Sequence, residues 1–303
     1  MTSLAHEAPR AAGRSLGRRA RDWAPAIAVF GFGLAAWQWI FPWLGVERFL
    51  LPPLADVLRA FWDARDELVR AGWITFQEAL GGFVLGCSLA FRFALVLARW
   101  RPLGSALMPY LVAANAVPIV AFAPITNAWF GTLSPWSKIV IAAVLCFFPV
   151  LVNTLRGLTS VRPESIELMQ SYAANQRAVF RRVRIPNSLP FLLSALKVAA
   201  VLAMIGAVVG DYFGGSTEAL GVQIVSAVSL AQYETAWAAI LVASVLGIVF
   251  YSVVALVERI VLSWHPSIKG RTEWGKALPA ERPEGLQVRR SRYRDAPGRD
   301  LRP

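Results

Sequence analysis

Six long apolar stretches constrain this 303-residue chain more than any other feature. Each holds about 20 mainly apolar residues, the length that a helix needs to cross the hydrocarbon core of a bilayer. With 56% hydrophobic and 17% charged residues, the chain has more apolar surface than a soluble domain can bury. Because only helices satisfy their own backbone in lipid, we predict an all-α integral membrane protein with about six transmembrane helices. The stretches are 24–44, 74–98, 104–124, 138–156, 188–210 and 235–257.

The charge of the connecting segments predicts the orientation of these helices, because Lys and Arg concentrate in cytoplasmic loops. Basic connections alternate along the chain with neutral or acidic ones, so both termini are expected in the cytoplasm. We divide the chain into a basic cytoplasmic segment 1–23, a transmembrane domain 24–257 that contains a cytoplasmic loop 157–187, and a basic tail 258–303. The tail is rich in Arg, Pro, Glu and Gly without periodicity, which predicts disorder.

The residue types inside the apolar stretches argue against several functions. An intramembrane enzyme needs a nucleophile with its base, or metal ligands, within the spans. His6 and His265 lie outside them, and Cys87 and Cys146 have neither metal-site nor disulfide spacing. We therefore predict no catalytic residue, no metal site and no enzyme activity. The net charge of +12 is distributed as in membrane proteins, so nucleic acid is not an expected partner.

The loop 157–187 has the pattern of two short helices. Pro163 suits the start of the first helix, and the acidic residues that follow suit its first turn. A turn is expected near Asn175, and Pro186 and Pro190 are expected to bound the second helix. The pair could simply cover the inner membrane surface with its apolar side. Glu167 favours docking instead, because a carboxylate in a basic loop can pair with an arginine of another protein.

The same loop resembles the signature of binding-protein-dependent ABC importer permeases, which reads Glu-Ala-Ala, three residues, Gly, nine residues, then Ile-x-Leu-Pro. Aligned on Pro186, the matched positions are Glu167, Leu168, Met169, Ala173, Val183 and Ile185. In that family the loop is a coupling helix that enters a cleft of the ATP-binding subunit, and its Gly allows a sharp turn. Ala173 departs from the pattern, because a residue with a Cβ enters left-handed conformations less readily than Gly.

The resemblance covers most of the chain and is greatest for the nitrate, sulfonate and taurine group, with matching blocks at 51–53, 129–131 and 219–221. It implies a type I ABC importer permease fold and a multi-pass location in the bacterial inner membrane. The implied partners are an ATP-binding cassette ATPase, an extracytoplasmic solute-binding protein, membrane lipid and a second permease chain in a homodimer. The implied ATPase-coupling residues are Glu167, Leu168, Met169, Ala173, Arg177 and Pro186.

No cofactor is expected in this chain, because it lacks the Gly-x4-Gly-Lys-Ser/Thr loop that cradles nucleotide phosphates. ATP and Mg would be bound by the partner ATPase. Segments 147–154 and 214–221 most resemble permeases for riboflavin or for the hydroxymethylpyrimidine precursor of thiamine. Two alternatives stay open. One is a permease for nitrate, sulfonate or taurine, and the other is an ion-coupled secondary transporter, because six spans with broken helices also suit that class.

Prolines inside two of the stretches predict a solute path. A proline leaves backbone carbonyls without partners, and such carbonyls favour a protein-lined or wet cavity. The candidate path residues are Asn115, Pro118, Pro149 and Asn153. As an alternative, the two asparagines could make hydrogen bonds between helices.

Charged residues near the ends of the stretches are expected to have structural or solvated roles rather than a role in transport. Glu78, Arg92 and Lys197 are each close enough to a span end to extend toward the interface. The resemblance implies that Lys197 is a structural tether near the inner surface, because the family commonly has a basic residue at this position. Arg92 is expected to pack against polar atoms of a neighbouring span. Asp211 and Glu218 follow the fifth stretch and are expected to be solvated in an outer loop.

Overall fold

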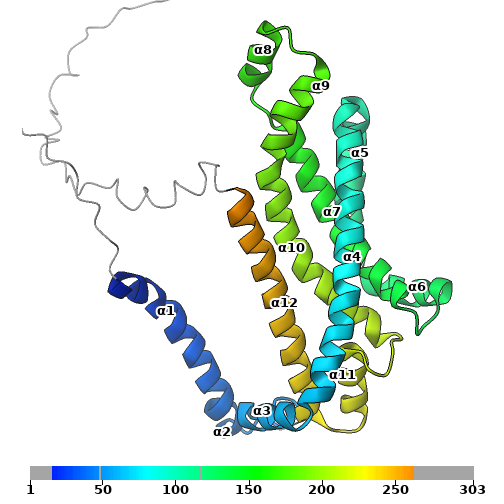
Figure 1. Ribbon diagram of the computed structural model, residues 1–303. Helices are drawn as coiled ribbons and strands as arrows, with labels where there is room; N and C mark the ends of the chain where they lie inside the picture. The colour runs from blue at the N-terminus through cyan, green and yellow to red at the C-terminus, as the bar shows by residue number, and fades with distance from the viewer. Residues whose placement is uncertain (1–15, 48, 117, 263–303) are drawn as a thin grey trace, which may run out of the picture. The chain divides into compact units, whose positions relative to one another are not determined.

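The computed structural model describes residues 16–47, 49–116 and 118–262, and all regular structure in these residues is helical (Figure 1). The prediction of an all-α protein is confirmed. The disorder predicted for the tail falls almost wholly on residues 263–303, which lie outside the described residues, as do His6 and His265.

Among the described residues, four helical segments are long and apolar enough to cross a membrane. They contain the predicted stretches 74–98, 138–156, 188–210 and 235–257. The third segment is continuous from α9 (Gln176–Val179) through a π-helical segment (Phe180–Arg184) into α10 (Ile185–Tyr212). The other three are α4 (Arg65–Arg99), α7 (Pro135–Thr159) and α12 (Tyr233–Val261).

The other two predicted stretches are interrupted and do not form single straight helices. In the first, α1 (Leu16–Ala35) passes into a π-helical segment (Ala36–Ile40) and the short α2 (Phe41–Trp43). In the second, α5 (Arg101–Ala114) ends before Pro118, and a 3₁₀ segment (Ile119–Phe122) leads into α6 (Ala123–Phe130). The physical reason for the second break is Pro118, which lacks an amide proton and restricts the residue before it.

Helices α4, α7 and α10 lie side by side and form the centre of the fold (Figure 1). Their backbones approach closely because glycines face alanines at the contacts. A Cβ on Gly86 of α4 would lie 2.3 Å from the carbonyl oxygen of Ala143, and one on Gly82 would lie 2.4 Å from the Cβ of Ala142. On the α10 side of α7, a Cβ on Gly206 would lie 2.8 Å from the Cα of Ala142. Small residues at such contacts allow the close packing that drives helix association in lipid.

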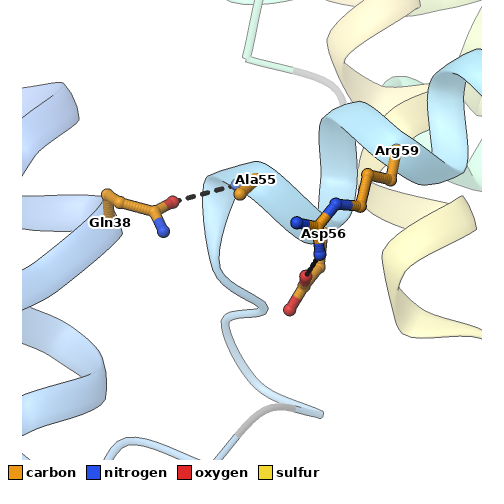
Figure 2. Close-up of polar contacts among 4 residues, drawn as sticks. All are labelled: Gln38, Ala55, Asp56 and Arg59. Atoms are coloured by element: carbon orange, nitrogen blue, oxygen red, sulfur yellow. Dashed lines mark hydrogen bonds and ion pairs between the residues drawn. The ribbon is translucent and has the colours of Figure 1, made fainter.

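The segment after residue 53 forms the amphipathic helix α3 (Leu54–Asp63). Its first turn has no side-chain cap of its own, and Gln38 of the preceding π-helical segment supplies one from outside. Gln38 Oε1 accepts a hydrogen bond of 2.9 Å from the Ala55 amide, and Arg59 forms an ion pair of 3.2 Å with Asp56 (Figure 2). The interrupted first stretch thus positions the start of α3.

Two shorter helices complete the described structure. α8 (Pro163–Ser171) precedes α9 in the loop 157–187, and α11 (Leu220–Ser229) lies between α10 and α12. The loop lies at the end of α7 and α10 that the charge pattern assigns to the cytoplasm. Cys87 and Cys146 are buried and free, as packing residues would be.

We predict that Gly86→Ala destabilises the protein, because the new Cβ would overlap a backbone carbonyl of α7 that cannot move aside. The expected cost is about 1–3 kcal/mol, seen as a lower midpoint of thermal unfolding in detergent. Gly33→Ala is the matched control, because Gly33 has no atom within 4 Å of the new Cβ. Equal melting temperatures for the two variants would contradict this account of the core.

Candidate functional site

The two helices of the loop meet at a turn centred on Ala173. Ala173 has a φ of 52°, in the left-handed region. The turn is closed by hydrogen bonds from the Ala174 amide to the Met169 carbonyl (3.0 Å) and from the Ala173 amide to the Gln170 carbonyl (2.8 Å). This pattern ends many helices, usually with Gly at the left-handed position. The chain therefore makes with Ala173 a turn that usually has Gly at this position.

Asn175 starts the next helix instead of making the turn that was predicted there. Its side-chain oxygen accepts a hydrogen bond from the Ala178 amide at 2.8 Å, which is the usual role of Asn at a helix N-terminus. The prediction that Pro186 and Pro190 bound this helix is wrong. Pro186 lies in the first turn of α10 and Pro190 inside it. The π-helical segment Phe180–Arg184 precedes them, and such segments accommodate breaks in the regular hydrogen-bond ladder.

The predicted coupling residues lie along this loop with different exposure. Glu167, Leu168, Ala173 and Arg177 are exposed, whereas Met169 and Pro186 are half-buried. Leu168 is 57% exposed, and Tyr172, at the end of α8, is 77% exposed. Large apolar or aromatic side chains exposed together beside a carboxylate and an arginine are typical of a surface that contacts a partner.

The loop is firmly attached to the helices behind it. Asn187 donates a hydrogen bond of 2.8 Å to the Gly157 carbonyl at the end of α7, and Arg184 donates one of 3.3 Å to the Ala98 carbonyl at the end of α4. Deeper in the bundle, Lys197 pairs with Glu258 at 2.5 Å, which ties α10 to α12 as the expected tether. A displacement of the loop would therefore be transmitted to α4, α7 and α10.

The candidate path residues form two separate local arrangements. Asn115, at the end of α5, donates to the Leu111 carbonyl (3.1 Å), and Asn153 on α7 donates to the Pro149 carbonyl (2.8 Å). Both hydrogen bonds stay within one segment of chain, so neither supports the alternative of bonds between helices. Pro118 is exposed at the break after α5, and Pro149 is half-buried within α7. A role for these residues in a solute path stays a prediction.

A buried polar cluster at the other end of α4, α7 and α10 was not predicted. It consists of Thr75, Glu78, Lys138 and Asp211. Lys138 is 0% exposed, Asp211 1% and Glu78 7%. The expectation that Asp211 is solvated in an outer loop is therefore wrong, because Asp211 lies in the last turn of α10. Glu78 does not extend to the interface either, because its side chain is enclosed between helices.

The cluster joins four helices. Asp211 Oδ2 accepts hydrogen bonds from the Thr75 hydroxyl (3.0 Å) and the Gly221 amide (3.4 Å), and the Thr75 oxygen accepts one from the Leu220 amide (2.9 Å). The first turn of α11 is thereby fixed to α4 and α10. Lys138 of α7 interacts electrostatically with both carboxylates and donates to the carbonyls of Thr132 and Ser134.

The positions of these four residues in the sequence contain a signal for the cluster, which apolar length alone does not reveal. Thr75 and Glu78 are three residues apart and so share a helix face, whereas Lys138 and Asp211 lie at the very ends of predicted stretches. Residues at such ends are ordinarily assigned to the interface.

The expectation that Arg92 packs against polar atoms of a neighbouring span is wrong within this chain, because its side chain is exposed on α4. Within the described residues, no three His, Cys, Asp or Glu side chains form a group that could hold a metal ion.

Comparison with known families identifies the chain at the level of its fold and class. Residues 82–262 match the model of the binding-protein-dependent transport system inner membrane component family. The match begins inside α4 and includes the loop, α10 and α12. The chain belongs to this family. It is thus a multi-pass membrane protein of the ABC importer permease class, as the loop motif predicted.

Individual relatives agree with this assignment. The chain is 34% identical over 236 residues to a riboflavin transport system permease protein of Chloroflexus aurantiacus, which covers 77% of this chain and 87% of the relative. It is 36% identical over 185 residues to a formylaminopyrimidine transport permease protein of Halalkalibacterium halodurans, with 60% and 72% covered. It is 28% identical over 260 residues to a putative aliphatic sulfonates transport permease protein of Bacillus subtilis, with 84% and 92% covered.

We predict that Ala173→Gly stabilises the loop, because Gly has no Cβ to oppose a left-handed conformation that costs other residues about 1–2 kcal/mol. Hydrogen exchange of the amides in α8 and α9 should slow by about fivefold, the equivalent of about 1 kcal/mol. Ala174→Gly is the control, because its φ is not positive, and it should leave exchange unchanged or faster. Faster exchange in Ala173→Gly than in the wild type would contradict the observed turn.

We also predict that Lys138→Met is strongly destabilising, because it leaves Glu78 and Asp211 buried without their cation. Removing one partner of a buried ion pair costs about 3–5 kcal/mol. Thermal unfolding in detergent measures the loss. Adding Glu78→Gln and Asp211→Asn to Lys138→Met should recover part of it, since the carboxylate charges are then gone. No loss in the single variant, or no recovery in the triple one, would refute the electrostatic role.

Proposed function

We propose that the chain is the membrane-spanning permease subunit of an ATP-driven importer, working with a separate ATPase at the loop 157–187. The observation that carries the proposal is the exposed pair Glu167 and Leu168 on a loop attached to α4 and α7 by hydrogen bonds. The described part of the chain leaves Leu168 and Tyr172 exposed, as a surface that contacts a partner requires. The ATPase activity, with its ATP and Mg, belongs to the partner.

Each coupling residue has a distinct part in the proposed contact. Glu167 pairs with an arginine of the ATPase, and charge-assisted hydrogen bonds of this kind are strong and directional. Leu168 enters an apolar recess of the partner, and Met169, half-buried, packs α8 against the chain's own helices. Ala173 makes the turn that presents α8 and α9 together, with Arg177 exposed on α9. Pro186, in the first turn of α10, fixes the backbone where the loop joins the long helix.

The proposed mechanism is alternating access between the two sides of the membrane. ATP binding brings two ATPase subunits together, and the loops of two permease chains follow. The hydrogen bonds of Asn187 and Arg184 transmit this movement to α7 and α4. Because α4, α7 and α10 are packed backbone to backbone, they move as a unit. Asn115, Pro118, Pro149 and Asn153 are the residues that we propose to contact the passing solute.

The remaining partners follow from the class and from the exposed surface. A second copy of the chain and membrane lipid would together cover the outward face of α12, where Ile248, Val253 and Leu256 are more than half exposed. An extracytoplasmic binding protein would deliver the solute. The bacterial inner membrane is the proposed location, because ATP is available on its cytoplasmic side and binding proteins work on the other.

We propose riboflavin or a pyrimidine precursor of thiamine as the solute. The relatives named for riboflavin and formylaminopyrimidine transport are 34% and 36% identical to this chain, compared with 28% for the relative named for aliphatic sulfonates. Nitrate, sulfonate or taurine remain the alternative solutes. Binding of each compound by the binding protein encoded beside this chain would distinguish them, since that protein selects the solute.

The buried cluster around Glu78 and Asp211 favours a second candidate, an ion-coupled secondary transporter. Buried carboxylates in transmembrane helices often carry protons or cations in such proteins. Here, however, one oxygen of Asp211 is engaged by Thr75 and the Gly221 amide, which fix the start of α11. This arrangement suits a structural joint, and the loop 157–187 would have no purpose without an ATPase.

We predict that Glu167→Lys weakens association with the ATPase encoded beside this chain by at least tenfold, because an attractive contact becomes repulsive. Co-expression, purification in detergent and quantification of the retained ATPase measure the effect. Glu218→Lys makes the same charge change at an exposed position on the opposite side and should retain the wild-type amount. If the wild-type chain retains no ATPase, or if Glu167→Lys retains as much as Glu218→Lys, the coupling role fails.

A further inference from the structure

A cavity of about 610 Å³ lies between the turn that joins α4 to α5 and the two helices of the loop 157–187. One wall is formed by Arg99, Trp100 and Leu103. The opposite wall is formed by residues of α8, of α9 and of the π-helical segment that follows α9, among them Gln170 and Arg184. The cavity is therefore bounded by the loop on one side and by the end of a membrane-spanning helix on the other.

The polar residues of this cavity suit an anion. Arg99 and Arg184 both line it, together with the amide side chains of Gln170 and Gln176, and none of its lining residues is Asp or Glu. Arg184 is held in place by its hydrogen bond to the Ala98 carbonyl. Arginine presents several donors in a planar arrangement that matches phosphate oxygens. The cavity thus has the fixed guanidinium of Arg184, the exposed guanidinium of Arg99 and the neutral amide donors of Gln170 and Gln176.

The location and the apolar residues of the cavity point to an amphiphile. Arg99 is the last residue of α4, and Trp100 follows it with 58% of its surface exposed. Trp and basic residues at the end of a spanning helix are typical of the level of the lipid headgroups. Leu103, Val179 and Phe180 line the same cavity. A ligand here would place its charge among the arginines and its apolar part along these side chains.

We propose that this cavity binds the headgroup of an anionic phospholipid from the cytoplasmic leaflet. Its phosphodiester lies between Arg99 and Arg184, with Gln170 as a further donor, and the first carbons of an acyl chain lie against Leu103. A zwitterionic lipid binds less well, because its ammonium group meets the same arginines. The bound lipid bridges α8 and α9 to the α4–α5 turn. This binding does not depend on the proposed transport function.

The test uses the full chain purified in detergent and native mass spectrometry with equimolar phosphatidylglycerol and phosphatidylcholine. The wild type should retain phosphatidylglycerol in preference to phosphatidylcholine. Arg99→Gln should lower that retention by about fivefold, as expected for the loss of one basic residue near an anionic headgroup. Arg182→Gln is the matched control, because Arg182 is an exposed arginine of the same loop that does not line the cavity, and it should retain the wild-type amount.

Two further measurements keep the proposal open to refutation. Gln170→Glu places a negative charge in the cavity from an exposed position and should also lower retention, so the test does not depend on Arg99→Gln folding normally. Millimolar glycerol 3-phosphate should not displace the lipid, because it lacks acyl chains. Displacement would show a site for free phosphate compounds and overturn the lipid assignment. Equal retention by all three variants and the wild type would overturn the site itself.

Discussion

The contact of α4 with α7 at Gly82 and Gly86 determines where the rest of the described structure can lie. A side chain at either position would overlap α7, so the two helices approach at a distance that only glycine permits. Gly206 brings α10 against the other side of α7 in the same way. In lipid this packing replaces the hydrophobic effect as the source of helix association, because the surroundings are as apolar as the side chains. The three helices consequently form one stiff unit.

Both polar regions of the protein depend on that unit. At one end, Lys138 of α7 can interact with Glu78 of α4 and Asp211 of α10 only because the three backbones lie so close. At the other end, the same helices receive Asn187 and Arg184 from the loop and its continuation into α10. A force applied at Glu167 would thus be passed through a close-packed core rather than absorbed by side-chain rearrangement. This connection is the structural basis of the proposed coupling.

The sequence predicted the class of fold, the two-helix loop and the position of its turn to within two residues. These features depend on local patterns, namely apolar length, prolines and the aligned motif. Two kinds of feature escaped prediction. The turn at Ala173 is left-handed without Gly, because the hydrogen bonds to Met169 and Gln170 impose that conformation. The burial of Asp211 depends on the first turn of α11, and Lys138 is held by the Thr132 and Ser134 carbonyls that follow α6. No pattern within a single stretch reveals these contacts.

The central claim is that ATP, hydrolysed by a partner, drives solute import through this chain. The most direct test is uptake into proteoliposomes that contain the chain and the ATPase encoded beside it, with the cognate binding protein loaded with the solute that it retains on purification. Our account predicts uptake that requires both ATP and the loaded binding protein, that persists when ion gradients are dissipated, and that is lost in Glu167→Lys. Uptake driven by an ion gradient in the absence of ATP would contradict it.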